Sequence, residues 1–127
     1  MSGSEVAKRI LIVDDEAPLA GLMADILSAD GHTVEIAVNG LAALAHVERS
    51  AYDLILSDLR MPELDGPGLY RELERRRPEL ARRIAFVTGS AQSAGMEQFL
   101  ARTGAPILYK PFRIQDLQKL VKDLLER

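Results

Sequence analysis

Asp58 stands where a largely apolar segment, residues 52–57, meets a loop that contains Pro62 and ends near Gly66. At the carboxyl ends of parallel strands, side chains point into a crevice where ligands and chemistry collect. An aspartate in such a place can attack phosphorus and carry an acyl phosphate. The alternative is an aspartate that bonds its own backbone within the turn. Asp58 is therefore the first candidate for a reactive side chain.

A second acidic group follows the apolar segment 9–13, where Asp14 and Asp15 are adjacent and Glu16 comes next. Neighbouring carboxylates repel one another and raise each other's pKa unless a cation neutralises them. Mg²⁺ suits this group because it prefers oxygen ligands and is held by one or two carboxylates together with phosphoryl oxygens. The same acids, followed by Pro18, also fit the start of a helix. Both interpretations can hold together.

Two further apolar segments end in side chains that bind phosphoryl oxygens. Residues 84–87 are followed by Thr88, and residues 106–109 are followed by Lys110. Threonine donates a hydrogen bond to such an oxygen, and lysine binds it as a point charge. Each signal is weak alone. Four strand ends that carry acids, a hydroxyl and an amine together predict a site for phosphoryl chemistry.

The elements that must position these side chains follow from the spacing of apolar residues. Alternating or continuous apolar segments predict five strands, and apolar residues at helical spacing predict five helices between and after them. The strands are expected at 9–13, 33–38, 53–57, 84–87 and 106–109. The helices are expected at 18–30, 67–76, 93–102 and 114–125, with a short helix after residue 39 that carries Leu41, Leu44 and Val47. We expect Asn39 to cap the second helix, and Gly31 and Gly104 to stop the first and fourth. This alternation predicts an α/β fold with a central parallel sheet.

These motifs together resemble the receiver domain of response regulators, the phosphoacceptor module of two-component signalling. The resemblance spans about residues 8–125 and depends on the acid pair, Asp58 with its Met-Pro and Asp-Gly turn, Thr88, and the Lys-Pro-Phe motif at 110–112. It implies that Asp58 is the phosphorylation site and that the metal ligands are Asp14, Asp15, Asp58 and the backbone carbonyl of Arg60. Thr88 would be the switch hydroxyl, and Lys110 would bind the phosphoryl group.

The same resemblance implies a flavodoxin-like (βα)5 fold, doubly wound, with strand order 2-1-3-4-5 and helices on both faces. The expected donor is a histidine kinase or a histidine phosphotransfer protein, and a downstream partner is expected on the surface of the fourth helix, fifth strand and fifth helix. Such a domain catalyses only its own Mg²⁺-dependent phosphorylation and dephosphorylation. The alternative is a pseudo-receiver, an interaction module that works without phosphorylation. The resemblance also implies a cis peptide bond between Lys110 and Pro111.

One position departs from the family. Receivers commonly carry an aromatic residue three positions before the lysine, and this chain has Ile107 there. Because strand side chains alternate, Tyr109 should share a face with Ile107 and oppose Lys110. We therefore expect Tyr109 to lie outside the phosphorylation pocket, on the surface expected to bind partners.

Two other classes of protein fit the residues less well. A phosphatase of the haloacid-dehalogenase kind places a second aspartate two residues after its nucleophile, where this chain has Arg60. A flavodoxin needs a phosphate-binding loop rich in serine, threonine and glycine after its first strand, and Asp14 and Asp15 would repel the flavin phosphate there. Both alternatives are therefore disfavoured.

Composition sets the remaining expectations. The chain has 127 residues, a net charge of -3 and no cysteine, which predicts one compact domain without disulfides. We expect a flexible segment over residues 1–7 and a receiver domain over 8–127. The arginine-rich stretch 71–83 also contains three glutamates and is interpreted as a solvated helix end rather than a nucleic-acid patch. A cytoplasmic protein that binds neither nucleic acid nor membrane is expected.

Overall fold

The computed structural model describes residues 8–89 and 93–126, which form one five-stranded parallel sheet. The flexible segment expected over residues 1–7 lies outside the described residues. The strand order is β2-β1-β3-β4-β5, as expected for a flavodoxin-like fold. The strands are β1 (Arg9–Val13), β2 (Thr33–Ala37), β3 (Leu54–Ser57), β4 (Ile84–Thr88) and β5 (Ile107–Tyr109).

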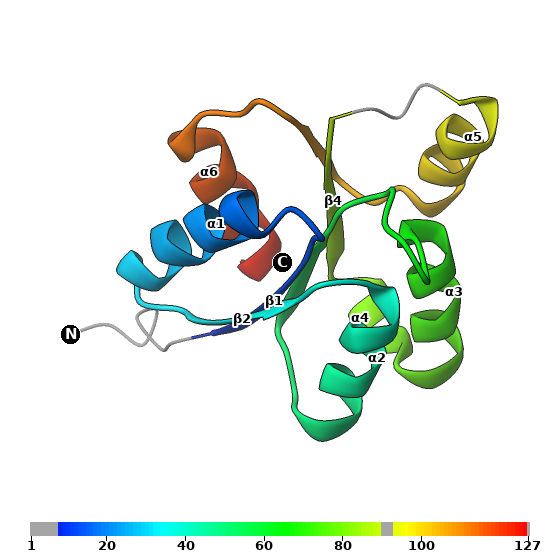
Figure 1. Ribbon diagram of the computed structural model, residues 1–127, viewed down its shortest axis with the longest axis horizontal. Helices are drawn as coiled ribbons and strands as arrows, with labels where there is room; N and C mark the ends of the chain where they lie inside the picture. The colour runs from blue at the N-terminus through cyan, green and yellow to red at the C-terminus, as the bar shows by residue number, and fades with distance from the viewer. Residues whose placement is uncertain (1–7, 90–92, 127) are drawn as a thin grey trace.

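Helices cover both faces of the sheet (Figure 1), with α1 and α6 on one face and α2 to α5 on the other. Their bounds are α1 (Ala17–Ala29), α2 (Gly40–Arg49), α3 (Gly66–Arg76), α4 (Pro78–Ala81), α5 (Ala94–Thr103) and α6 (Ile114–Leu125). Five helices were predicted, and the described residues form six. The additional α4 is a single turn that begins at Pro78, which fits the first turn of a helix. The helices expected as the fourth and fifth of the fold are therefore α5 and α6 in this structure.

Local side-chain chemistry explains several element boundaries. The Asn39 side chain accepts a hydrogen bond from the Ala42 N–H at 2.8 Å, which confirms the predicted cap of α2. Helix α5 ends at Gly104, whose φ of 68° lies in the left-handed region that glycine adopts without a steric cost. These caps place the helix starts and stops within a residue or two of the predicted positions.

Two apolar clusters fill the space on either side of the sheet. Successive residues of a strand point to opposite faces, so Leu11 belongs to the cluster under α2, α3 and α5, and Ile12 to the cluster under α1 and α6. Two large apolar residues of these helices lie mostly outside both clusters. Leu22 is 51% exposed because the buried stripe of α1 runs through Ala20, Met23 and Leu27, and Ile114 is 54% exposed at the first turn of α6.

A polar network lies near the amino ends of β1 and β3. The hydroxyl of the buried Tyr52 donates a hydrogen bond to Glu35 and lies 3.3 Å from Nδ1 of His46. Arg9 pairs with Glu35 at 3.4 Å, and its guanidinium carbon lies 5.4 Å from the centre of the Tyr52 ring. We call Arg9, Glu35, His46 and Tyr52 the amino-end network. It connects β1, β2, α2 and the segment before β3.

None of the helices among the described residues is long and apolar enough to cross a membrane.

Candidate functional site

The first acidic positions of the site are fixed by the sheet itself. Val13 pairs with Ser57 in the parallel ladder between β1 and β3, so Asp14 and Asp58 both come one residue after paired positions. The ladder continues past the strand ends, because the Asp58 N–H donates to the Val13 carbonyl at 2.9 Å. Both carboxylates are nearly inaccessible to solvent, with Asp14 2% and Asp58 7% exposed. The sheet therefore places two buried acids side by side at its carboxyl edge.

The loop after β3 orients the Asp58 side chain. The N–H of Leu59 donates to Oδ1 of Asp58 at 2.7 Å, and the N–H of Arg60 points to the same oxygen at a longer 3.4 Å. Gly66 lets this loop lie close to α3, because a Cβ on residue 66 would come within 2.9 Å of the Asp58 carbonyl oxygen. The backbone thus holds one oxygen of Asp58 and leaves Oδ2 toward the sheet edge.

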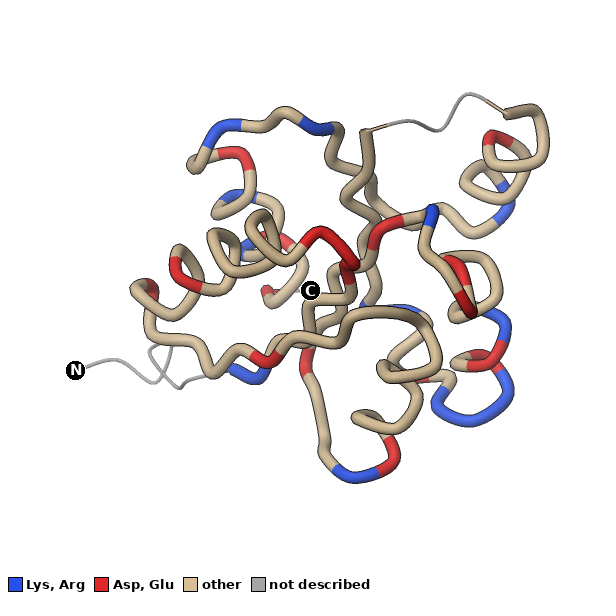
Figure 2. Tube along the Cα trace, in the orientation of Figure 1, with Lys and Arg blue, Asp and Glu red and all other residues tan. Residues whose placement is uncertain are grey.

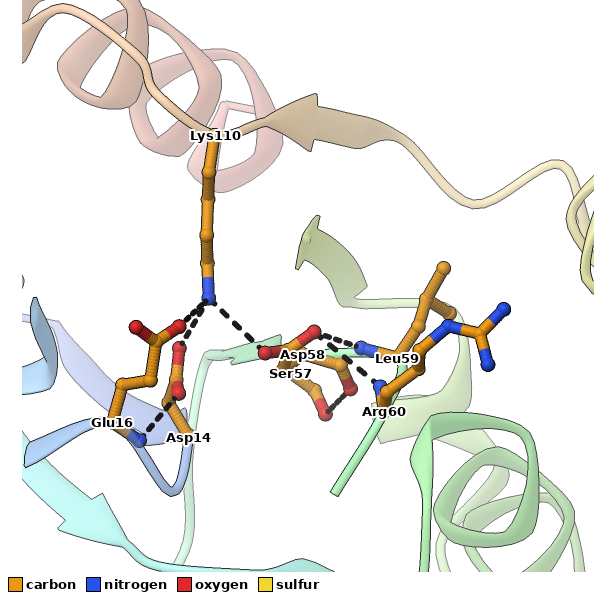
Figure 3. A network of polar contacts seen from close by, with 7 residues as sticks. All are labelled: Asp14, Glu16, Ser57, Asp58, Leu59, Arg60 and Lys110. Atoms are coloured by element: carbon orange, nitrogen blue, oxygen red, sulfur yellow. Dashed lines mark hydrogen bonds and ion pairs between the residues drawn. The ribbon is translucent and has the colours of Figure 1, made fainter. Parts of the chain in front are cut away.

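Lys110 reaches the two acids from β5. The backbone N–H of Lys110 donates to the backbone carbonyl of Thr88 at 2.9 Å, which continues the pairing of β5 with β4. The Lys110–Pro111 peptide bond is cis, as the resemblance implied. Figure 3 shows the side chain extended toward the acidic loops, where Nζ lies 3.1 Å from Asp14, 3.1 Å from Asp58 and 2.9 Å from Glu16. One ammonium thus meets three carboxylates.

The cluster of Asp14, Glu16, Asp58 and Lys110, which we call the carboxyl-end cluster, is electrostatically unbalanced. Burial raises the pKa of Asp14 even though the Glu16 N–H and the Lys110 ammonium act in the opposite direction. Burial alone would lower the pKa of Lys110, but its hydrogen bonds to Glu16, Asp58 and Asp14 outweigh burial and raise that pKa. The carboxylates carry more negative charge than Lys110 offsets.

The donor set of this cluster suits a hard divalent cation. Asp14, Glu16 and Asp58 each offer a carboxylate oxygen, and these oxygens lie within 4.8 Å of one another. Oxygen-only sites with several carboxylates are typical of Mg²⁺ and Ca²⁺. These residues therefore fit the Mg²⁺ that the adjacent acids suggested.

The structure brings together three of the predicted site residues, Asp14, Asp58 and Lys110. Thr88 ends the neighbouring strand β4 and is 2% exposed. Asp15 is exposed and is not among the three grouped carboxylates; Glu16 occupies that place instead. The sequence marked all three consecutive acids but could not tell which side chains turn toward Lys110.

Ile107, which departs from the family pattern, and Tyr109, two residues later in β5, lie in different surroundings. Tyr109 is 54% exposed, whereas Ile107 packs against the apolar cluster under α2, α3 and α5. The expected exposure of Tyr109 is therefore confirmed in this structure.

Charge is distributed unevenly over the fold (Figure 2), with acidic segments in the loops after β1 and β3 and basic segments around the end of α3 and α4. Arg75 pairs with Glu72 at 2.8 Å and Arg76 pairs with Glu48 at 2.8 Å. Such exposed pairs fit the interpretation of this stretch as a solvated helix end.

Comparison with known proteins places this site in a defined context. The family model described as the response regulator receiver domain matches residues 10–122. The chain is 36% identical over its whole length to the sensor kinase CckA of Brucella abortus, of which it spans 13%. It is 32% identical to the response regulator receiver protein CpdR of the same organism, over 93% of this chain and 97% of CpdR.

A solved structure shares the fold closely. The CheY-like response regulator receiver domain protein of Methanospirillum hungatei superposes with a TM-score of 0.86 at 33% sequence identity. The alignment covers 94% of both chains. The similarity thus extends over almost all of the described residues.

Proposed function

This chain belongs to the response regulator receiver domain family, a family of signalling domains, and on that premise we propose that it accepts a phosphoryl group on Asp58 and thereby switches the binding of a partner protein. The position of Asp58 carries the proposal. This buried carboxylate is held by a backbone N–H at Oδ1 and faces an ammonium group at Oδ2. It is therefore preorganised at the carboxyl edge of the sheet.

The proposed reaction is an in-line displacement at phosphorus. A carboxylate oxygen of Asp58 forms the new O–P bond while the P–N bond of a phosphohistidine breaks, and the electron pair leaves with the donor imidazole. Positioning and electrostatic stabilisation dominate catalysis of phosphoryl transfer. The N–H of Leu59 holds Asp58 in place, and Lys110 offers positive charge beside it. The domain in this way promotes its own modification.

Mg²⁺ is the proposed cofactor. Asp14, Asp15, Asp58 and the backbone carbonyl of Arg60 would hold it, and when bound it would supply positive charge that offsets the charge of the phosphoryl oxygens. Asp14 and Asp58 contribute negative potential that retains a cation, and the burial of these two carboxylates reduces the screening of that potential, whereas Asp15 is exposed.

Thr88 is proposed as the group that senses the new charge. Thr88 ends β4, the strand next to β3, and we expect its hydroxyl to move toward a phosphoryl oxygen on Asp58. The added charge would shift an existing equilibrium of the loops and α5 toward an active state. A coupling of roughly 1 to 3 kcal/mol would change partner affinity by about fivefold to 150-fold.

The proposed phosphodonor is a histidine kinase or a histidine phosphotransfer protein. CckA is itself named a sensor kinase, and a region of it resembles this chain. We propose that the downstream partner binds the surface of α5, β5 and α6, on which Tyr109 is exposed. Tyr109→Ala should weaken partner binding more than it slows phosphorylation, measured by titration and by labelling rate. Slower labelling with unchanged partner affinity would instead assign Tyr109 to the phosphorylation site.

Labelling with a small donor tests the proposed function directly. Incubation with acetyl phosphate and Mg²⁺ should add the mass of one phosphoryl group to the wild-type chain and none to Asp58→Asn. The variant should fold normally, because the asparagine side chain can still accept the Leu59 N–H. A wild-type chain that takes up no label, while its fold is intact, would favour the pseudo-receiver alternative. Full labelling of Asp58→Asn would show that another residue is the acceptor.

A further inference from the structure

The arrangement of hydrogen bonds around Lys110 leaves its ammonium fully engaged. A lysine ammonium has three donors, and here Nζ lies within 3.1 Å of three separate carboxylates. Asp14 and Asp58 are buried neighbours that the sheet places there. The third carboxylate, Glu16, has the shortest distance to Nζ, 2.9 Å. A phosphoryl oxygen that binds Lys110 must therefore displace one of these acceptors.

Glu16 differs from the other two acceptors in exposure and in its freedom to move. Its side chain is 61% exposed, compared with 2% for Asp14 and 9% for Asp58. Glu16 occupies the N-cap position of α1 but makes no side-chain cap, so its carboxylate has no competing role there. Among the three acceptors, it can release Lys110 at the lowest cost.

The backbone keeps Glu16 aimed at Lys110. Oδ1 of Asp14 accepts the Glu16 N–H at 2.8 Å, which fixes the turn between β1 and α1. Asp14 uses its other oxygen for Lys110, so the two acids, two residues apart, approach the same ammonium while Asp15 between them stays exposed. Figure 3 shows both side chains rising from this turn toward Nζ. The turn between β1 and α1 therefore holds Glu16 close to Lys110.

We propose that Glu16 is a positioning residue that restrains Lys110 in the unphosphorylated domain, so that the Glu16–Lys110 ion pair must open before Lys110 binds the incoming phosphoryl group. This inference rests on the proposed function of Asp58. The Glu16 carboxylate also places a negative charge beside an anionic donor. Both effects slow phosphorylation, so Glu16 sets the rate at which the domain responds.

The exposure of Glu16 fixes the size and the salt dependence of the effect. Exposed ion pairs contribute little to stability, so the free-energy cost of opening one is small. Such a cost corresponds to a rate change of roughly two- to fivefold. Ionic strength screens exposed charges far more than buried ones. The restraint should therefore weaken in high salt, whereas the contacts of Lys110 with Asp14 and Asp58 persist.

The test compares Glu16→Gln and Glu16→Ala with wild type in acetyl phosphate labelling at saturating Mg²⁺. Both variants should label Asp58 about two to five times faster in low salt, and the difference should shrink toward equality in high salt. Glu63→Gln is the matched control, since it removes the same charge from an exposed position in the loop after β3. It should label at close to the wild-type rate.

A second measurement does not depend on phosphorylation. NMR of the metal-free protein measures how fast the Lys110 ammonium hydrogens exchange with water. This exchange should be faster in both Glu16 variants than in wild type or Glu63→Gln. Equal labelling rates in wild type and the Glu16 variants would overturn this inference alone. So would a rate gain shared by Glu63→Gln, which would indicate net charge as the cause. Absence of labelling in wild type would overturn the proposed function itself.

Discussion

Two charged clusters sit at opposite ends of the same strands and differ in how their charges are matched. In the amino-end network, one arginine faces one glutamate, and the neutral Tyr52 hydroxyl bridges to the same carboxylate. In the carboxyl-end cluster, three carboxylates share one lysine. The first set is close to neutral, and the second has an excess of negative charge.

One carboxyl group in each cluster has a shifted pKa, and these two shifts have opposite directions. The hydrogen bond from Tyr52 lowers the pKa of Glu35, so the folded chain favours its charged form. Burial raises the pKa of Asp14, so the folded chain disfavours its charge despite Lys110. A network that serves stability satisfies its charges internally. The carboxyl-end cluster, which we propose binds a cation and a phosphoryl group, keeps charge that the fold alone does not neutralise.

Removal of the cation from each cluster should give the largest contrast. Lys110→Met leaves the buried carboxylates Asp14 and Asp58 without a cationic partner, which should cost about 3 kcal/mol of unfolding free energy in metal-free buffer. Arg9→Met breaks a partly exposed pair and should cost less than about 1 kcal/mol. Urea unfolding of both variants measures the difference.

Addition of Mg²⁺ sharpens this comparison. A divalent cation should restore part of the stability of Lys110→Met, because it replaces the missing positive charge among the carboxylates. It should leave Arg9→Met nearly unchanged. Equal losses of unfolding free energy in the two variants, with no response to Mg²⁺, would contradict the proposed difference in charge balance between the two clusters.

Neutralising one acid in each cluster should shift stability in opposite directions. At pH 7 and without metal, Asp14→Asn should raise the unfolding free energy, since it removes a charge that burial disfavours. Glu35→Gln should lower it, by less than about 1 kcal/mol for a residue this exposed. Urea unfolding at pH 7 compares both variants with wild type. A loss of stability in Asp14→Asn would contradict the charge excess proposed for the site.

The pH dependence follows from the signs of the two shifts. The raised pKa of Asp14 makes its protonated form stabilising, so that contribution is present below the ordinary value of 3.8 and is lost as pH rises through the folded pKa. The lowered pKa of Glu35 gives a contribution that is present above 4.5 and is lost as pH falls through the folded pKa. Both variants should therefore converge on wild type in acid.

The smallest effect concerns the Tyr52 hydroxyl. Tyr52→Phe removes the part-buried hydrogen bond to Glu35 and should cost about 0.5 kcal/mol of unfolding free energy, the low end for a net hydrogen bond. It should also raise the pKa of the Glu35 carboxyl, because that hydrogen bond is the main cause of its lowering. Carboxyl chemical shifts followed by NMR over pH measure the change. An unchanged Glu35 titration would show that Arg9 and His46 hold the charge without Tyr52.

Sequence patterns predicted the skeleton of the fold because the inner strands of a parallel sheet are buried on both faces and read as continuous apolar segments, whereas the edge strand β2 alternates. Asp14, Asp58, Thr88 and Lys110 each follow such a segment, so their gathering at one edge followed from topology. The strand order came from the resemblance, since periodicity does not report which strands are neighbours. The single turn α4 was missed because four residues are too few to show a helical period.

The details that escaped prediction depend on local conformation. Which of three consecutive acids turns toward Lys110 is set by the hydrogen bond between Asp14 and the Glu16 N–H, and residue type does not encode that bond. Leu22 has the right residue type and an approximate helical spacing, yet it lies beside the narrow buried stripe of α1. Exposure at the margin of a helix face depends on what the neighbouring elements cover.

The contact between Lys110 and Asp14 spans 96 positions of the chain. Contacts of such long separation close large loops and form slowly compared with local ones. During synthesis the acidic loops after β1 and β3 emerge from the ribosome well before residue 110, so the nascent chain carries these acids without their lysine. Assembly of the carboxyl-end cluster therefore requires nearly the whole domain, and a chain interrupted before residue 110 cannot form it.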